Sequence, residues 1–247
     1  MFHNNIVTIQ ANAILVSDAH YNPLRQDFLS FLNAILRTEI QTSQLILMGD
    51  IFDFLAGEIT YFQKQNQEII DKINHLANKI EIIYLEGNHD YNLENIFSNV
   101  KIITRKSQPL QCEFWDNTKY QSEIKTRKVM LAHGDIYTPK SYDLYTSIIR
   151  NSALLKVLNF IDVTNWLTKR IDFWLREKNL VHEFTDFEKF AIKRLYKYKY
   201  AKADLIIEGH FHQGKSYKTY TNLPAFGIEN QYFSFLDKKI IKFQSKN

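Results

Sequence analysis

The chain has 247 residues, of which 45% are hydrophobic and 23% charged, a composition typical of globular proteins rather than of disordered ones. Its formal net charge of +4 is too small to require an anionic partner, and no apolar run approaches the roughly 18–20 residues of a membrane-spanning helix. The single cysteine excludes an intrachain disulfide, and the first twelve residues lack a signal-peptide pattern, so we expect a cytoplasmic protein.

Five short apolar runs along the chain predict buried strands, because neither face of their pattern is polar. The runs are residues 13–17, 45–48, 82–85, 129–132 and 205–207. Residues 23–38 and 59–80, which lie between the first three runs, carry apolar side chains at helical spacing. This alternation predicts an α/β sheet protein, in which ligands bind at the carboxyl ends of the strands.

Residues 137–200 interrupt the alternation with a helical, aromatic and basic segment that has no strand pattern. We predict that it is a lid or cap inserted into a core of residues 1–136 and 201–247. Its apolar stripes either pack on one another and on the core, or hold acyl chains while basic side chains meet phosphates. The run 193–202 alternates bases with aromatics, and we favour a solvated helix face over a nucleic-acid or membrane patch.

The tail after Gly214 contains short alternating stretches that predict antiparallel strands finishing a second sheet. A hairpin turn is expected at residues 237–239. The predicted strands cover residues 215–220, 226–228, 231–236 and 240–243.

Each predicted strand of the alternating part ends in a motif rich in metal-ligand residues. These motifs hold five of the eight histidines and four of the seven glycines, a concentration that scattered surface residues would not show. Hard oxygen ligands with imidazoles suit two divalent ions, which can clamp a phosphoryl group and activate water. The motifs are Asp18-Ala19-His20, Gly49-Asp50, Gly87-Asn88-His89-Asp90, His133-Gly134-Asp135 and Gly209-His210-Phe211-His212.

Spacing within the first two motifs suggests how the ligands are arranged. Asp18 and His20 are two residues apart on a strand end, so we expect both side chains to leave one face and reach one ion. Asp50 follows a glycine that permits a sharp turn, which makes it the expected bridge between the ions. Asn88 offers an amide oxygen, and the later histidines add imidazoles.

The residues beside the ligands are expected to act on the substrate or to orient the ligands. His89 neighbours Asn88, so we expect its ring to face the substrate, where it stabilises charge or protonates a leaving group. Asp90 is expected to orient His89. Asp53 and Asp135 are expected to hydrogen-bond ligand imidazoles.

In these motifs the chain resembles the calcineurin-type metallophosphoesterase superfamily, whose complete pattern is present between residues 18 and 212. The resemblance implies a four-layer sandwich of two mixed β-sheets flanked by helices. It implies two divalent ions, Mn²⁺ or else Fe, Zn or Mg. One ion is then held by Asp18, His20, Asp50 and His212, and the other by Asp50, Asn88, His133 and His210.

Within that superfamily, the size and the insertion are similar to the UDP-2,3-diacylglucosamine hydrolases of lipid A synthesis. This resemblance implies hydrolysis of the pyrophosphate by metal-activated water, giving UMP and 2,3-diacylglucosamine 1-phosphate, with the inner-membrane surface as a partner. The implied substrate-binding residues are Asn88, His89, Tyr145 and Arg150. The main form of that enzyme carries Arg at the position of His89.

Two alternatives to this function stay open. One is a metallophosphoesterase acting on a nucleotide, a phosphoprotein or a nucleic acid, of which the nucleic acid is the least expected. The other is a metal-binding scaffold without catalysis, which the complete ligand set disfavours. No obligate protein partner is inferred.

Overall fold

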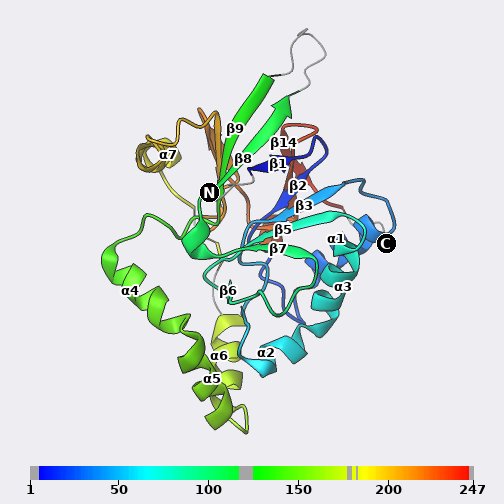
Figure 1. Cartoon of the computed structure of the whole chain (residues 1–247), viewed down its shortest axis with the longest axis vertical. Helices are drawn as coiled ribbons and strands as arrows, with labels where there is room; N and C mark the ends of the chain where they lie inside the picture. Colours follow the sequence, from blue (N-terminus) through cyan, green and yellow to red (C-terminus); the bar gives the residue numbers. More distant parts are fainter. Residues whose placement is uncertain (1–5, 117–124, 177–179, 182, 245–247) are drawn as a thin grey trace, which may run out of the picture.

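Two mixed sheets of six strands each form the centre of the protein, in a computed structural model that describes residues 6–116, 125–176, 180–181 and 183–244 (Figure 1). The first sheet has the order β14-β13-β2-β3-β5-β7 and the second β1-β8-β9-β10-β12-β11. The first comprises Lys239–Lys242, Gln231–Ser234, Ile14–Val16, Gln44–Leu47, Glu81–Leu85 and Val100–Ile103. The second comprises Val7–Ile9, Leu110–Asp116, Lys125–Ala132, Leu205–Glu208, Tyr220–Asn222 and Lys215–Tyr217.

Helices cover both outer faces of these sheets. Side chains from the two inner faces, such as Ile46 and Val129, pack into one core. On the outer face of the first sheet lie α1 (Asp27–Leu36) and α3 (Gln67–Ala77), which bury their apolar stripes there. Helix α7 (Phe187–Lys197) packs on the second sheet. The predicted four-layer sandwich of two mixed β-sheets flanked by helices is therefore confirmed.

Parallel pairing brings the motif-bearing strand ends together. Strands β2, β3 and β5 run parallel in one sheet, with Leu15 opposite Ile46 and Ile46 opposite Ile83. In the other sheet β9 and β10 run parallel, with Leu131 opposite Ile207. Because the carboxyl ends of parallel strands meet at one edge, the loops after these strands converge at one edge of the sandwich.

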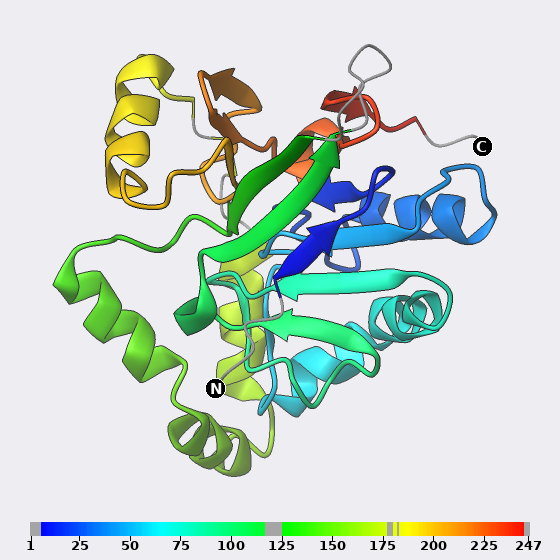
Figure 2. The same ribbon diagram turned by 45° about the horizontal axis from the view of Figure 1, so that its top comes forward.

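Three helices of the 137–200 segment form an arm below the sheets in the view of Figure 1, whereas α7 lies apart from them (Figures 1 and 2). The arm consists of α4 (Lys140–Ile149), α5 (Ser152–Ile161) and α6 (Trp166–Arg176). It rests on the core through Leu155 and Ile171, which pack near α2 (Thr60–Gln65) and the small sheet of β4 (Leu55–Ala56) and β6 (Asp90–Tyr91). The boundaries of the lid stay a prediction. No helix in the described ranges is long and apolar enough to cross a bilayer.

The tail differs from the predicted one. Residues 226–228 lie in helix α8 (Phe226–Glu229) rather than in a strand. There the Phe226 ring packs against Phe28 and Phe31 of α1. The tail strands also divide between the sheets, with β11 and β12 in one and β13 and β14 in the other. The predicted turn before Lys239 is present. Earlier in the chain, the single helix predicted at 59–80 is two helices that meet at Asn66.

Candidate metal centre

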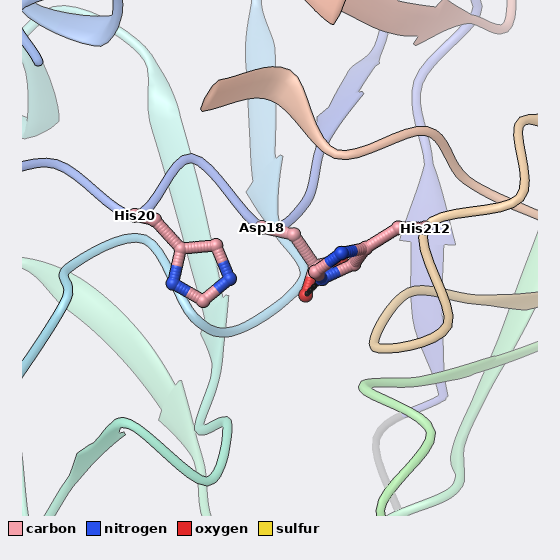
Figure 3. Close-up of side chains that lie close together, drawn as sticks. All are labelled: Asp18, His20 and His212. Atoms are coloured by element: carbon pink, nitrogen blue, oxygen red, sulfur yellow. Dashed lines mark hydrogen bonds and ion pairs between the residues drawn. The ribbon is translucent and has the colours of Figure 1, made fainter. Parts of the chain in front are cut away.

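Two clusters of buried donor atoms lie at the edge where the motif loops converge. Asp18, His20 and His212 form one cluster, which Figure 3 shows with the His20 ring facing the other two side chains. Asp50, His133 and His210 form the second. In each cluster one donor atom from every residue lies within 4.8 Å of the others. The structure therefore brings together six of the seven predicted ligands, and the seventh, Asn88, places Oδ1 3.2 Å from Nε2 of His133.

Most of these ligands adopt left-handed backbone conformations. This finding contradicts the expectation that Asp18 and His20 leave one face of an extended strand, since β2 already ends at Val16. Non-glycine residues pay a steric cost at positive φ, and such strain persists mainly at functional sites. The φ angles are 53° for Asp18, 44° for His20, 51° for Asp50, 66° for His210 and 57° for His212.

Two glycines leave room for the ligands. A Cβ atom on Gly49, whose φ is +87°, would lie 2.5 Å from Nδ1 of His133. A Cβ atom on Gly87 would lie 2.2 Å from Oδ1 of Asp50. The backbone of these two motifs therefore approaches the ligands of another motif more closely than any side chain permits.

In each cluster the buried carboxylate is paired with an imidazole of the same cluster. Nε2 of His212 lies 3.2 Å from Oδ1 of Asp18, and Nε2 of His133 lies 3.5 Å from Oδ2 of Asp50. Burial alone would raise the pKa of Asp18, but the charge and hydrogen bond of His212 lower it to about 2. Burial lowers the pKa of His133, but the Asp50 carboxylate outweighs it and holds that pKa well above its ordinary value.

The remaining imidazoles fit a metal site because they are buried, neutral and available. Burial lowers the pKa of His20 to about 3 and that of His210 to about 4. Among the described residues neither ring nitrogen of His20 has a hydrogen-bond partner, and its Nδ1 lies 3.6 Å from Oδ1 of Asp53. A buried polar atom without a partner is costly, whereas a metal ion would satisfy it. Hence the donor set fits two divalent cations.

His89 lies beside the first cluster rather than in either set. Its ring is in edge contact with that of His20, with 5.3 Å between centroids. Nδ1 of His89 lies 2.7 Å from the carbonyl oxygen of Asp53, and donation of its N–H to that oxygen would fix the ring orientation. The geometry thus separates His89 from the ligands while keeping it at the site.

Asp90 does not have the expected role of orienting His89. Its carboxylate is fully buried and accepts N–H groups of Asp50 at 3.0 Å, Ile51 at 2.6 Å and Gly87 at 2.7 Å. It also accepts the Tyr84 hydroxyl at 2.6 Å. Asp90 therefore holds together the second and third motif loops, a role that its place in the motif did not reveal.

Replacing this carboxylate by an amide is expected to destabilise the fold. Asp90→Asn keeps one acceptor oxygen and turns an NH₂ group toward backbone N–H donors, so the free energy of unfolding should fall by about 3 kcal/mol. Urea denaturation measures this loss. Asp71→Asn on the exposed side of α3 is the matched control, and equal stability of the two variants would contradict the role of Asp90.

Asp135 also departs from its expected role, and Arg150 is one of its two arginine partners. Oδ2 of the fully buried Asp135 accepts from Arg105 at 2.9 Å and from Arg150 at 3.2 Å, not from a ligand imidazole. Nη2 of Arg150 also donates to the Gly87 carbonyl at 2.6 Å, so Arg150 ties the arm to the third motif. Tyr145 is 56% exposed on α4. Arg105 escaped the sequence analysis because the strand before it was not predicted.

Comparison with known proteins agrees with this geometry. The family model described as calcineurin-like phosphoesterase matches residues 12–214. The chain is 27% identical over 124 residues to a UDP-2,3-diacylglucosamine hydrolase of Tolumonas auensis, covering 49% of this chain and 46% of that one. It is 22% identical over 169 residues to the enzyme of the same name from Vibrio parahaemolyticus, covering 67% of this chain and 61% of that one. The alignments thus span less than two thirds of these relatives.

Solved structures of low similarity also match over most of the chain. A phosphoesterase of E. coli, Yfce, has a TM-score of 0.39 at 13% identity and covers 96% of this chain and 100% of its own. A nuclease of Pseudomonas putida has a TM-score of 0.41 at 13% identity and covers 94% and 88%.

Proposed function

The chain belongs to the calcineurin-like phosphoesterase family and is a metal-dependent phosphoester hydrolase, and we propose that it cleaves the pyrophosphate of UDP-2,3-diacylglucosamine. The products would be UMP and 2,3-diacylglucosamine 1-phosphate. The names of its relatives suggest this substrate. The observation that carries the proposal is the exposed apolar surface of the arm, which Arg150 ties to the third motif.

The arm exposes large apolar side chains that a soluble substrate would not need. Phe160, Trp166, Phe173 and Trp174 are 60–81% exposed, so the stripes do not simply pack on one another. The guanidinium of Arg170 lies 5.7 Å from the Trp166 ring and 5.0 Å from the Trp174 ring. Aromatic rings interleaved with a cation suit acyl chains and anionic headgroups at a membrane surface. We propose that the protein works on the cytoplasmic face of the inner membrane.

The ions of the family's dinuclear centre would be held by the two clusters, with Asp50 between them, and we propose Mn²⁺. Bound there, two divalent ions supply an activated water and neutralise charge on the phosphoryl group. The chain itself fixes the donors through loops with left-handed backbone conformations, and the Asp53 carboxylate lies 3.6 Å from Nδ1 of His20 without hydrogen-bonding it. We propose that Asn88 and His89 contact a phosphoryl oxygen of the substrate.

His89 would contribute by donating a hydrogen bond or a proton to the substrate. A hydrogen bond from Nδ1 to the Asp53 carbonyl would fix the ring, so a contact with the substrate would be made through Nε2. His89→Asn should lower kcat by about 10²–10³-fold while metal content stays unchanged. Steady-state kinetics with metal analysis measures both, and a parallel loss of metal would make His89 a ligand instead.

The substrate assignment is tested with purified protein and Mn²⁺. We expect release of UMP from UDP-2,3-diacylglucosamine in detergent micelles, detected by chromatography, and loss of that release after chelation with EDTA. Asp71→Asn serves as a control for protein quality. Good turnover of a model diester without turnover of the glycolipid would refute the proposed substrate. It would still agree with a phosphoester hydrolase.

The nucleic-acid alternative loses its best support in the 193–202 run. Arg194 and Tyr198 of this run are buried, and both bind the carboxylate of Glu208. Only part of this run therefore lies on the surface, so the solvated helix face that we expected is also only partly present.

A further inference from the structure

A polar cavity of about 490 Å³ lies where the arm meets the core. Its walls come from the segment after β5, from the 3₁₀ helix Arg105–Ser107 after β7, and from the corner between α4 and α5. The volume is within the range of small-ligand sites. Every lining residue is polar or charged, among them Glu86, Asn92, Arg105, Lys106, Arg150 and Ser152.

The cavity shares a wall with the metal centre. Glu86 lines the cavity, and Asn88, two residues further on, lies 3.2 Å from His133 in the second cluster. Between them the Gly87 carbonyl accepts the Arg150 guanidinium, which also lines the cavity. The cavity therefore adjoins the loop that carries Asn88, so a group bound in it would lie close to a substrate phosphate at the metals.

The charges of the lining favour an anionic group with hydroxyls attached. Arg105 and Arg150 share the buried Asp135, whereas Lys106 is exposed and makes no ion pair within the described residues. Nε of Arg150 is buried without a hydrogen-bond partner. Glu86 and Asp143 also line the cavity, and such carboxylates would repel a bare anion on that side but accept hydrogen bonds from hydroxyls.

We propose that this cavity binds the nucleoside monophosphate half of the substrate. The inference rests on the proposed function, since it concerns the substrate of the same site. Cations beside acceptors and hydroxyls match a phosphate joined to a ribose and a base. The charged and hydrogen-bonding groups of the lining favour a polar ligand, and the exposed apolar side chains of the arm suit the lipid half of a nucleotide-linked lipid better.

The test reverses the charge of Lys106, the one exposed lysine that lines the cavity. In Lys106→Glu we expect the dissociation constant of UMP, measured calorimetrically in the presence of Mn²⁺, to rise about 10-fold or more. The KM for the glycolipid should rise in parallel with kcat nearly unchanged, and hydrolysis of bis-(p-nitrophenyl) phosphate should not change. Lys101→Glu, on the exposed side of β7, is the matched control.

A second variant keeps the inference falsifiable if Lys106→Glu does not fold. Ser152→Asp places a negative charge at the start of α5 and should weaken UMP binding in the same way. Unchanged UMP affinity in the folded variant would overturn the inference even if the glycolipid is hydrolysed. Weakened UMP binding without any glycolipid turnover would support the cavity and refute only the lipid substrate.

Discussion

Asp50→Asn is expected to reduce phosphoester hydrolysis by more than about 100-fold. Loss of groups that merely orient metal ligands costs about 10–100-fold, and Asp50 is itself in a donor cluster. Its carboxylate is almost fully buried, has a pKa far below the ordinary range, and accepts the His89 backbone N–H at 2.8 Å. An amide in its place removes the negative charge that would attract the divalent ions.

The measurement combines activity on a model diester with metal analysis of the same preparation. Metal content should fall in Asp50→Asn and remain unchanged in Asp71→Asn, which also replaces a carboxylate by an amide but on the surface of α3. If Asp50→Asn keeps its full metal content and more than a tenth of the activity, Asp50 is not a metal ligand.

The sequence was sufficient to locate the site because parallel strands impose simple rules. Buried strands such as β3 and β5 have continuous apolar runs, and their carboxyl ends share an edge, so the motif loops had to converge. Strands β1, β7 and β8 were not predicted, because they are short or alternate with exposed residues, as in the pattern of Val7–Ile9. Arg105, which follows β7, was therefore missed as well.

The conformation of the loops could not be read from the sequence. Asp and His seldom adopt positive φ, so the spacing of Asp18 and His20 pointed to an extended segment, whereas contacts with other loops hold both in left-handed conformations. Asp90 illustrates a second limit. Its role depends on backbone N–H groups of Asp50 and Ile51, about forty residues away in the chain.

Helix α7 was the least predictable element, because its chemistry resembles that of a solvated helix. The carboxylate of Glu208 on β10 is fully buried, and Arg194 donates to it through Nε at 2.7 Å and through Nη2. The hydroxyls of Tyr198 and Tyr220 donate to the same carboxylate at 2.5 and 2.8 Å. The ion pair joins a residue of α7 to a residue of β10, so the sequence of either segment alone does not predict it.

Arg194→Met is expected to lower the free energy of unfolding by about 3–5 kcal/mol, because it leaves the buried Glu208 charge without a cation. Arg194 also donates to the carbonyls of Gly134 and Ile136 at 3.2 Å, beside the His133 motif, and these bonds are lost too. Urea denaturation measures the change. Lys193→Met, one residue away on the exposed side of α7, should change stability by less than about 0.5 kcal/mol.

The double variant Arg194→Met/Glu208→Gln separates the unpaired charge from the lost contacts. If the buried charge dominates, the double variant should be more stable than Arg194→Met alone, because a neutral amide is far less costly to bury than a carboxylate without its cation. If packing and the two carbonyl contacts dominate, the double variant should be less stable still, since it loses the tyrosine hydrogen bonds to a carboxylate as well. The sign of the difference in unfolding free energy between the double variant and Arg194→Met therefore decides whether the buried charge or the lost contacts dominate.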